Sequence, residues 1–168
     1  MFVRWYDRYL MVLFAFASFI ALFYEPAFFF FVDCGWEGIG QGLQGPCSQT
    51  WIGRAWLGYL QIEPIYAHAP LWIQLLNETD FFIFGWFNLL TLIILIKDLA
   101  YKRWYRNLAT FMCGMMAYSL TLYLWWEVLS AEETKSNLPA VIIANGMWLV
   151  FYGSLFIRIY LIRDPRAT

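Results

Sequence analysis

Hydrophobic residues fill four stretches of the chain that are long enough to cross a membrane as helices. These stretches run from about 9 to 32, 70 to 96, 108 to 129 and 138 to 162. A transmembrane helix needs about 20 mostly apolar residues, and each stretch reaches that length. Pro70 and Pro139 stand at the predicted starts of the second and fourth stretches, where a missing backbone N–H costs nothing. The pattern predicts an all-α integral membrane protein, a bundle of four transmembrane helices.

The composition also indicates a multi-pass membrane protein. Of the 168 residues, 62% are hydrophobic and 14% are charged, whereas soluble domains have about 45–50% apolar and about 25% charged residues. The net charge of −1 gives no basis for nucleic-acid binding. A chain of this length predicts a single domain over 1–168. We expect it in the endoplasmic reticulum membrane of a eukaryote or in the cytoplasmic membrane of a bacterium.

The distribution of lysine and arginine predicts the orientation of the helices. These residues gather at Arg4 and Arg8, in the connection 97–106, and at Arg158, Arg163 and Arg166. The other two connections hold only Arg54 and Lys135. Because basic residues favour the cytoplasmic side, both termini and the connection 97–106 are predicted to be cytoplasmic. The long connection 33–69 is then predicted to lie on the opposite side, outside the membrane.

Cysteine and histidine usage gives limited information about bonds and metals. Cys34 and Cys47 both lie in the connection 33–69, so they could form a disulfide in an oxidising compartment. The alternative is that they are two ordinary small residues near the membrane surface. Cys113, inside the third stretch, is expected to serve packing. His68 is the single histidine, and no ligand cluster predicts a metal site or a cofactor.

Three polar side chains interrupt the hydrophobic stretches at similar depths. Glu25 and Asn145 lie roughly 10 Å from the outer ends of their predicted helices, and Asp80 lies roughly 15 Å from Pro70. A charged side chain at membrane depth costs about 2.5–3.5 kcal/mol or more, so such residues usually have a function. Glu25, Asp80 and Asn145 therefore predict a polar layer inside the bundle.

Aromatic and amide side chains share helix faces with this layer. Positions three or four apart lie on one face of a helix. That spacing joins Asn77 and Phe84 to Asp80, and it joins Trp148 to Asn145. Trp148 is too deep to belong to the aromatic belt at the membrane surface. Tyr118 in the third stretch is a further candidate, although such a tyrosine more often belongs to the core or the belt.

Two buried carboxyl groups can share a proton, so that one acts as an acid and the other as a base. They could protonate an alkene and remove a proton elsewhere, and an aromatic face stabilises the carbocation between these steps. The candidate catalytic residues are Glu25 and Asp80. The candidate substrate-binding residues are Asn77, Phe84, Tyr118, Asn145 and Trp148.

Structural alternatives exist for the acidic residues. Glu25 could pair with a partner near the membrane surface, and Asp80 could cap a helix that begins at Phe81. Glu78 and Glu127 lie nearer the outer surface, so we expect them to be solvated or ion-paired.

Three segments carry a resemblance to a known family. They are ALFYEPAFFF with Glu25, WLGYLQIEPIYAHAPLWIQLLNETDFF with Asp80 eight residues after Trp72, and NGMWLVFYG with Asn145 and Trp148. Their order and spacing resemble the EXPERA-domain family, which includes sterol Δ8–Δ7 isomerases and receptors of the sigma-two type. The likeness spans nearly the whole chain.

The resemblance implies roles for the four matched polar and aromatic positions. Glu25 and Asp80 would carry the proton transfers, Asn145 would orient a group, and Trp148 would face the cation. It also implies a pocket open to the membrane, a sterol or isoprenoid ligand, and commonly a homodimer. The isomerases have a histidine where this chain has Ala21, and in lacking it the chain is closer to the sigma-two branch, which binds sterols without an established reaction.

The sequence therefore leads to three functional hypotheses. The first is a membrane-embedded isomerase or cyclase of a sterol or other cyclic isoprenoid, which works by acid/base proton transfer. The second is a non-catalytic sterol-binding or lipid-trafficking protein of the sigma-two-receptor type. The third is a small structural subunit of a membrane complex, whose aromatic surface contacts protein.

Overall fold

The computed structural model describes residues 2–26, 46–68 and 70–162, and every element in these ranges is a helix. Four helices are long and apolar enough to cross a membrane, as the sequence predicts. They are α1 (Phe2–Phe19) with η1 (Ile20–Tyr24), the continuous run of α5 (Leu71–Thr79), η5 (Asp80–Gly85) and α6 (Trp86–Ile96), α7 (Arg103–Thr134), and α8 (Leu138–Tyr160). The shorter helices are η3 (Pro46–Gln49), α4 (Trp51–Tyr59) and η4 (Pro64–Ala67).

The helix bounds differ most from the predictions in the first and third helices. α1 begins seven residues before the predicted position 9, and α7 extends beyond 108–129 at both ends. The extra turns of α7 are polar, because a helix continues past its apolar part as long as the residues favour helix. It stops at Lys135, whose φ of 57° lies in the left-handed region. The predicted end of the first helix at 32 lies outside the described residues.

Local capping explains two helix starts. The Asn137 side chain accepts a hydrogen bond from the Ala140 amide, and Pro139 stands in the first turn of α8. The Thr50 hydroxyl oxygen accepts from the Gly53 amide at 3.1 Å and so caps α4. These caps mark sequence positions at which each helix can begin without unpaired backbone donors.

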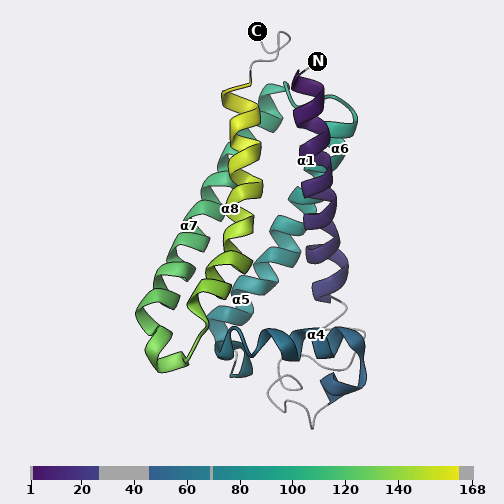
Figure 1. Ribbon diagram of the computed structural model, residues 1–168. Helices are drawn as coiled ribbons and strands as arrows, with labels where there is room; N and C mark the ends of the chain where they lie inside the picture. The colour runs from purple at the N-terminus through teal and green to yellow at the C-terminus, as the bar shows by residue number, and fades with distance from the viewer. Residues whose placement is uncertain (1, 27–45, 69, 163–168) are drawn as a thin grey trace.

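The four long helices form a bundle, and α4 lies across one end of it (Figure 1). α7 packs along α8, and α1 packs against α6 and α8. α1 begins and α8 ends at the same end of the bundle, opposite α4. Such an arrangement agrees with termini on one side of a membrane, while their cytoplasmic location stays a prediction.

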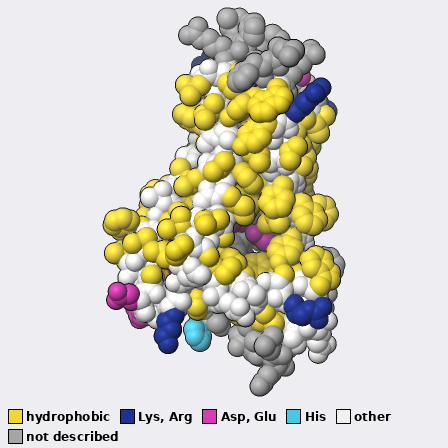
Figure 2. Space-filling model, viewed as in Figure 1, with side chains coloured by type: hydrophobic (Ala, Val, Ile, Leu, Met, Phe, Trp, Pro, Cys, Tyr) yellow, Lys and Arg dark blue, Asp and Glu magenta, His cyan; other side chains and the backbone are white. Residues whose placement is uncertain are grey.

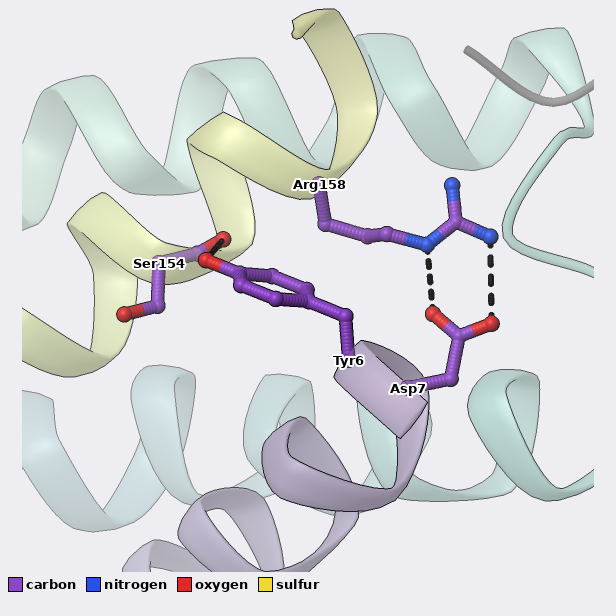
Figure 3. Close-up of polar contacts among 4 residues, drawn as sticks. All are labelled: Tyr6, Asp7, Ser154 and Arg158. Carbon is purple, nitrogen blue, oxygen red and sulfur yellow. Dashed lines mark hydrogen bonds and ion pairs between the residues drawn. The ribbon is translucent and has the colours of Figure 1, made fainter. Parts of the chain in front are cut away.

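A buried ion pair joins α1 to α8 at the end opposite α4 (Figure 3). The Arg158 guanidinium donates two hydrogen bonds to the Asp7 carboxylate, one of them through Nη2 at 3.1 Å. Beside it, the Tyr6 hydroxyl donates to the Ser154 carbonyl oxygen at 3.1 Å. Arg158 is 2% exposed. The cation that the sequence places at the cytoplasmic end of the last helix is therefore an internal partner of Asp7.

The segment before α4 is held closely against that helix. A Cβ at Gly53 would lie 2.1 Å from the Cys47 carbonyl oxygen, so only glycine permits this approach. Cys47 is buried and disulfide-bonded, whereas Cys113 is a buried free thiol, as expected for packing. Cys34, the predicted partner of Cys47, lies outside the described residues.

Candidate functional site

A cavity of about 270 Å³ lies between η1, α4, η4, α5 and α8. Its lining combines carboxyl, amide, hydroxyl and aromatic groups: Ile20, Tyr24, Glu25, Ala55, Trp56, Tyr59, Tyr66, Asn77, Asp80, Ala144, Asn145, Met147 and Trp148. Figure 2 shows acidic side-chain atoms inside a hollow on a face that is otherwise largely hydrophobic. No lysine, arginine or histidine is among the described residues that line the cavity.

Most of the candidate residues from the sequence meet at this cavity. Glu25, Asn77, Asp80, Asn145 and Trp148 all line it. Two others do not.

Phe84 is buried with its ring edge against Tyr152, at 5.7 Å between ring centroids. Tyr118 is 69% exposed and borders a separate groove between α5 and α7, together with Trp72 and Trp126. Helical spacing predicts which face of its own helix each of these residues occupies. Whether that face contacts the cavity depends on the positions of the neighbouring helices.

The two membrane acids lie on or beside π-helical turns that pack against each other. Glu25 directly follows η1, and Asp80 begins η5. The two segments approach closely at Gly85, where a Cβ would lie 2.8 Å from Leu22 Cδ2 and 3.2 Å from Ala21 Cβ. π-helical turns inside α-helices frequently occur at functional sites, because the inserted residue re-aims the side chains that follow.

The structure decides between the alternatives for Asp80 and informs those for Glu25. The second helix begins at Leu71 and continues through Asp80, so the interpretation of Asp80 as a cap of a helix starting at Phe81 is wrong. Glu25 is 8% exposed, and its Oε2 atom is buried without a hydrogen-bond partner among the described residues. Glu25 therefore adds to the cavity lining a carboxyl group with one oxygen that is buried and unpaired among the described residues.

The side-chain NH₂ groups of the two asparagines in the cavity lining, Asn77 and Asn145, are held by hydrogen bonds within the protein. Asn145 Nδ2 donates to the Tyr59 hydroxyl oxygen at 3.2 Å and to the Val141 carbonyl oxygen at 3.0 Å. Asn77 Nδ2 donates to the Tyr66 hydroxyl oxygen at 3.2 Å and to a carbonyl oxygen of the preceding helical turn at 2.9 Å. Since an amide NH₂ has two hydrogens, the amide oxygens remain as acceptors. The asparagines and the two carboxyls give the cavity several acceptors.

An aromatic cluster from the connection between the first two long helices forms one wall. Trp56 stacks on Tyr24, with an interplanar angle of 15° and 6.0 Å between ring centroids. Tyr59 lies edge-on to both Trp56 and Tyr66, at 6.1 and 5.5 Å. The sequence predicts this segment outside the membrane, and none of these aromatic residues is among the candidate site residues predicted from it. The spacing of three, four and three residues through Trp56, Tyr59, Glu63 and Tyr66 is a helical pattern that could have indicated a common face.

Two further acids are buried behind this wall. Glu63 and Glu127 are both 0% exposed, so the expectation that Glu127 is solvated is wrong. The Tyr59 hydroxyl donates a hydrogen bond to Glu63 Oε2. Burial raises the pKa of Glu63 to about 7, against the hydrogen bond from Tyr59, which lowers it, and with a smaller raising effect of Glu127. Burial also raises the pKa of Tyr59, with the neighbouring Tyr66 and Glu63 acting in the same direction.

Comparison of the chain with family models, with curated proteins and with solved structures finds no match. The resemblance to the EXPERA-domain family therefore stays a prediction that rests on the sequence motifs.

Proposed function

We propose that this chain is a membrane-embedded isomerase-like protein that acts on a sterol or other cyclic isoprenoid by acid/base proton transfer. The observation that carries the proposal is the cavity itself. Glu25 and Asp80, 55 positions apart in the chain, line one cavity together with Trp56 and Trp148. No basic residue in the cavity lining neutralises these two carboxyl groups. They therefore suit proton exchange with an uncharged lipid at membrane depth.

The reaction requires one carboxyl to be protonated and the other to be ionised. The protonated carboxyl gives its proton to one alkene carbon, and the π electrons form the new C–H bond, which leaves a carbocation on the adjacent carbon. The ionised carboxyl then removes a proton from a neighbouring carbon, and that C–H electron pair forms the shifted double bond. One proton enters and one leaves, so no other reactant is needed. Trp56 and Trp148 line the same cavity, where an aromatic ring beside the intermediate cation stabilises it.

The position of the cavity suits a ligand that arrives from the lipid. The hollow opens on a largely hydrophobic face of the bundle (Figure 2), and Ile20 of η1 and Met147 of α8 are apolar members of the cavity lining. Its volume of about 270 Å³ is at the lower limit of typical small-molecule pockets, about 300–1,000 Å³. It therefore accommodates the reacting rings while the rest of the lipid stays in contact with the apolar surface. The Asn145 amide oxygen is available to accept a hydrogen bond from a ligand hydroxyl.

The test begins with the protein purified in lipid nanodiscs and mass spectrometry of its bound lipids. A panel of sterols and cyclic isoprenoids with ring double bonds is then incubated with the protein in D₂O. We expect a product with a shifted double bond that carries deuterium at the protonated carbon. Glu25→Gln and Asp80→Asn should each slow its formation by about 100-fold or more.

Glu78→Gln is the matched control, because Glu78 is an exposed acid on the same helix as Asp80. It should leave both binding and turnover unchanged. Full turnover by the double variant of Glu25 and Asp80 would contradict the proposal.

A second candidate function is non-catalytic sterol binding, and the packing of Ala21 favours it. The resemblance implies a histidine at this position in the isomerases. Ala21 is 2% exposed and its Cβ faces Gly85 of η5, so a histidine would not fit without separation of η1 and η5. Under this function a sterol co-purifies unaltered with the wild type, and no candidate incorporates deuterium.

A further inference from the structure

Glu63 is a buried acid at the cavity wall that the proposed reaction does not use. It lies between α4 and η4, and it is 0% exposed. The groups that face it come from four elements: Tyr59 of α4, Tyr66 of η4, Glu127 of α7 and Asn145 of α8. None of these groups is a base that could neutralise its charge. Three of them are hydroxyl or amide groups, and all three of these residues, Tyr59, Tyr66 and Asn145, line the cavity.

A directed chain of hydrogen bonds links Glu63 to the cavity. The Tyr59 hydroxyl donates its only proton to Glu63 Oε2, and its oxygen accepts from Asn145 Nδ2 at 3.2 Å. Tyr59 lines the cavity, but in this arrangement its proton points away from any ligand. The ionised form of Glu63 therefore leaves this part of the wall with an amide oxygen as acceptor and without the Tyr59 hydroxyl as donor.

Protonation of Glu63 reverses this arrangement. A neutral carboxyl needs an acceptor for its own proton, and the Tyr59 oxygen is already within hydrogen-bond distance. The Tyr59 hydroxyl can accept that proton in a hydrogen bond while it turns its own O–H toward the cavity. Only a hydrogen atom rotates, so no backbone or ring movement is required. The pKa of Glu63, raised by burial to about 7, makes both forms accessible near neutral pH.

We propose that Glu63 is a positioning residue that sets, through Tyr59, whether the cavity wall offers its ligand an O–H donor. The ligand whose binding depends on the direction of the Tyr59 O–H is the isoprenoid of the proposed function. The identity of the ligand therefore rests on the proposed function. A sterol hydroxyl both donates and accepts, so it can bind in either state. A sterol ketone only accepts, so it binds well only when Tyr59 donates. Glu63 thereby controls the choice between alcohol and ketone forms of the lipid.

The binding test compares a 3-ketosterol, cholest-4-en-3-one, with cholesterol, each radiolabelled, in nanodiscs at about pH 5.5 and about pH 8.5, on either side of the pKa of Glu63. In the wild type the ketone, relative to cholesterol, should bind up to about tenfold more tightly at the lower pH, the effect of one hydrogen bond. Glu63→Gln and Tyr59→Phe should both abolish this pH dependence, and Glu78→Gln should keep it. Equal pH dependence in wild type and Glu63→Gln would overturn the inference.

Infrared difference spectroscopy tests the coupling without any ligand. In the wild type, tyrosine side-chain bands should change between the two pH values together with a carboxyl band. Glu63→Gln should lose both changes, and Tyr59→Phe should lose the tyrosine change but keep the carboxyl change. A tyrosine response that survives in Tyr59→Phe overturns the inference. If the infrared changes occur as expected and no sterol binds at either pH, the proposed function fails while the coupling of Glu63 to Tyr59 stands.

Discussion

Four carboxyl groups among the described residues are buried, and each is accommodated differently. Asp7 is ion-paired with Arg158, and Glu63 accepts a hydrogen bond from Tyr59. Glu25 lines the cavity, and one of its oxygens is buried without a hydrogen-bond partner among the described residues. Glu127 lies near Glu63 and raises the pKa of that carboxyl. Burial of an uncompensated charge is unfavourable, so the acids without a cationic partner are the ones for which a function is expected.

Stability should depend on pH through Glu63. Its pKa is raised from 4.5 to about 7 by burial, so the unfolded chain loses this proton at lower pH than the folded protein. The contribution of Glu63 to the free energy of unfolding is therefore fully present below about pH 4.5, and it is lost as the pH rises through about 7. The loss amounts to about 3 kcal/mol.

The measurement is reversible unfolding in detergent between about pH 5 and about pH 8. Glu63→Gln should show a smaller fall in stability across this range than the wild type, whereas Glu78→Gln should match the wild type. Identical slopes for Glu63→Gln and the wild type would refute the assignment.

At the scale of elements, the paired π-helical segments decide where the acids point. η1 and η5 each change the helical register next to an acid, and they pack together at Gly85. In a regular α-helix the side chains of Glu25 and Asp80 would lie at other angles around their helix axes. The sequence places these acids at similar depths, but the local winding and the close approach decide that both line one cavity.

Gly85→Ala should destabilise the protein and weaken lipid binding. The added Cβ would lie 2.8 Å from Leu22 Cδ2 and 3.2 Å from Ala21 Cβ, so the Leu22 side chain must shift and the contact between η1 and η5 becomes overpacked. Overpacking of this kind costs about 1–3 kcal/mol. Thermal unfolding and the amount of co-purified lipid measure the effect.

Two variants control for this prediction. Leu22→Ala combined with Gly85→Ala should recover stability relative to Gly85→Ala, because the contacted atoms are removed. Gly114→Ala should be tolerated, since a Cβ at Gly114 meets nothing within 4 Å. A loss in Gly114→Ala equal to that in Gly85→Ala would show that the close approach is not the cause.

At the scale of the whole molecule, α1 and α8 are joined at one end and separated at the other. The ion pair of Asp7 with Arg158, the hydrogen bond from Tyr6 to Ser154, and the ring contact of Phe16 with Phe151 connect them along most of α1. Farther along, Ile20 and Trp148 line the cavity. The ion pair (Figure 3) therefore fixes one end of the helix pair, and the cavity occupies the other.

Removal of the Asp7 charge should be strongly destabilising. Asp7→Ala leaves the Arg158 guanidinium, which is 2% exposed, without its carboxylate partner. Breaking a buried pair in this way costs about 3–5 kcal/mol. Replacement of both residues, as in Asp7→Leu with Arg158→Met, should recover much of the loss in thermal unfolding. An unchanged unfolding temperature of Asp7→Ala would contradict a buried, paired Arg158.

Both termini should lie on the cytoplasmic side. The start of α1 and the end of α8 lie at the same end of the bundle. The connection 97–106 is rich in lysine and arginine, which favour the cytoplasmic side. Reporter fusions at each terminus and labelling of a cysteine introduced at exposed Gln61 test this arrangement. If the cysteine at position 61 is labelled from the cytoplasmic side, the predicted orientation is wrong.

The sequence by itself determined that the chain is helical and gave the approximate course of four helices long and apolar enough to cross a membrane, whereas the depth of the polar positions stays a prediction. These follow from hydrophobic length and helical rise, which are local properties of the chain. It also singled out Glu25, Asp80, Asn145, Asn77 and Trp148, because polar or aromatic side chains deep in an apolar stretch are conspicuous.

Only the tertiary structure decided which other residues join them. Trp56, Tyr59, Glu63 and Tyr66 come from a segment with no membrane-length hydrophobic pattern. This segment forms α4 and η4, and α4 lies across the end of the bundle. Glu127 and Arg158 are charged residues near helix ends, yet both are buried by neighbours that lie far away in the sequence. Burial and hydrogen-bond direction depend on such non-local contacts. The acid pair that stood out in the sequence is therefore only part of a cavity whose hydrogen-bonding wall required the fold.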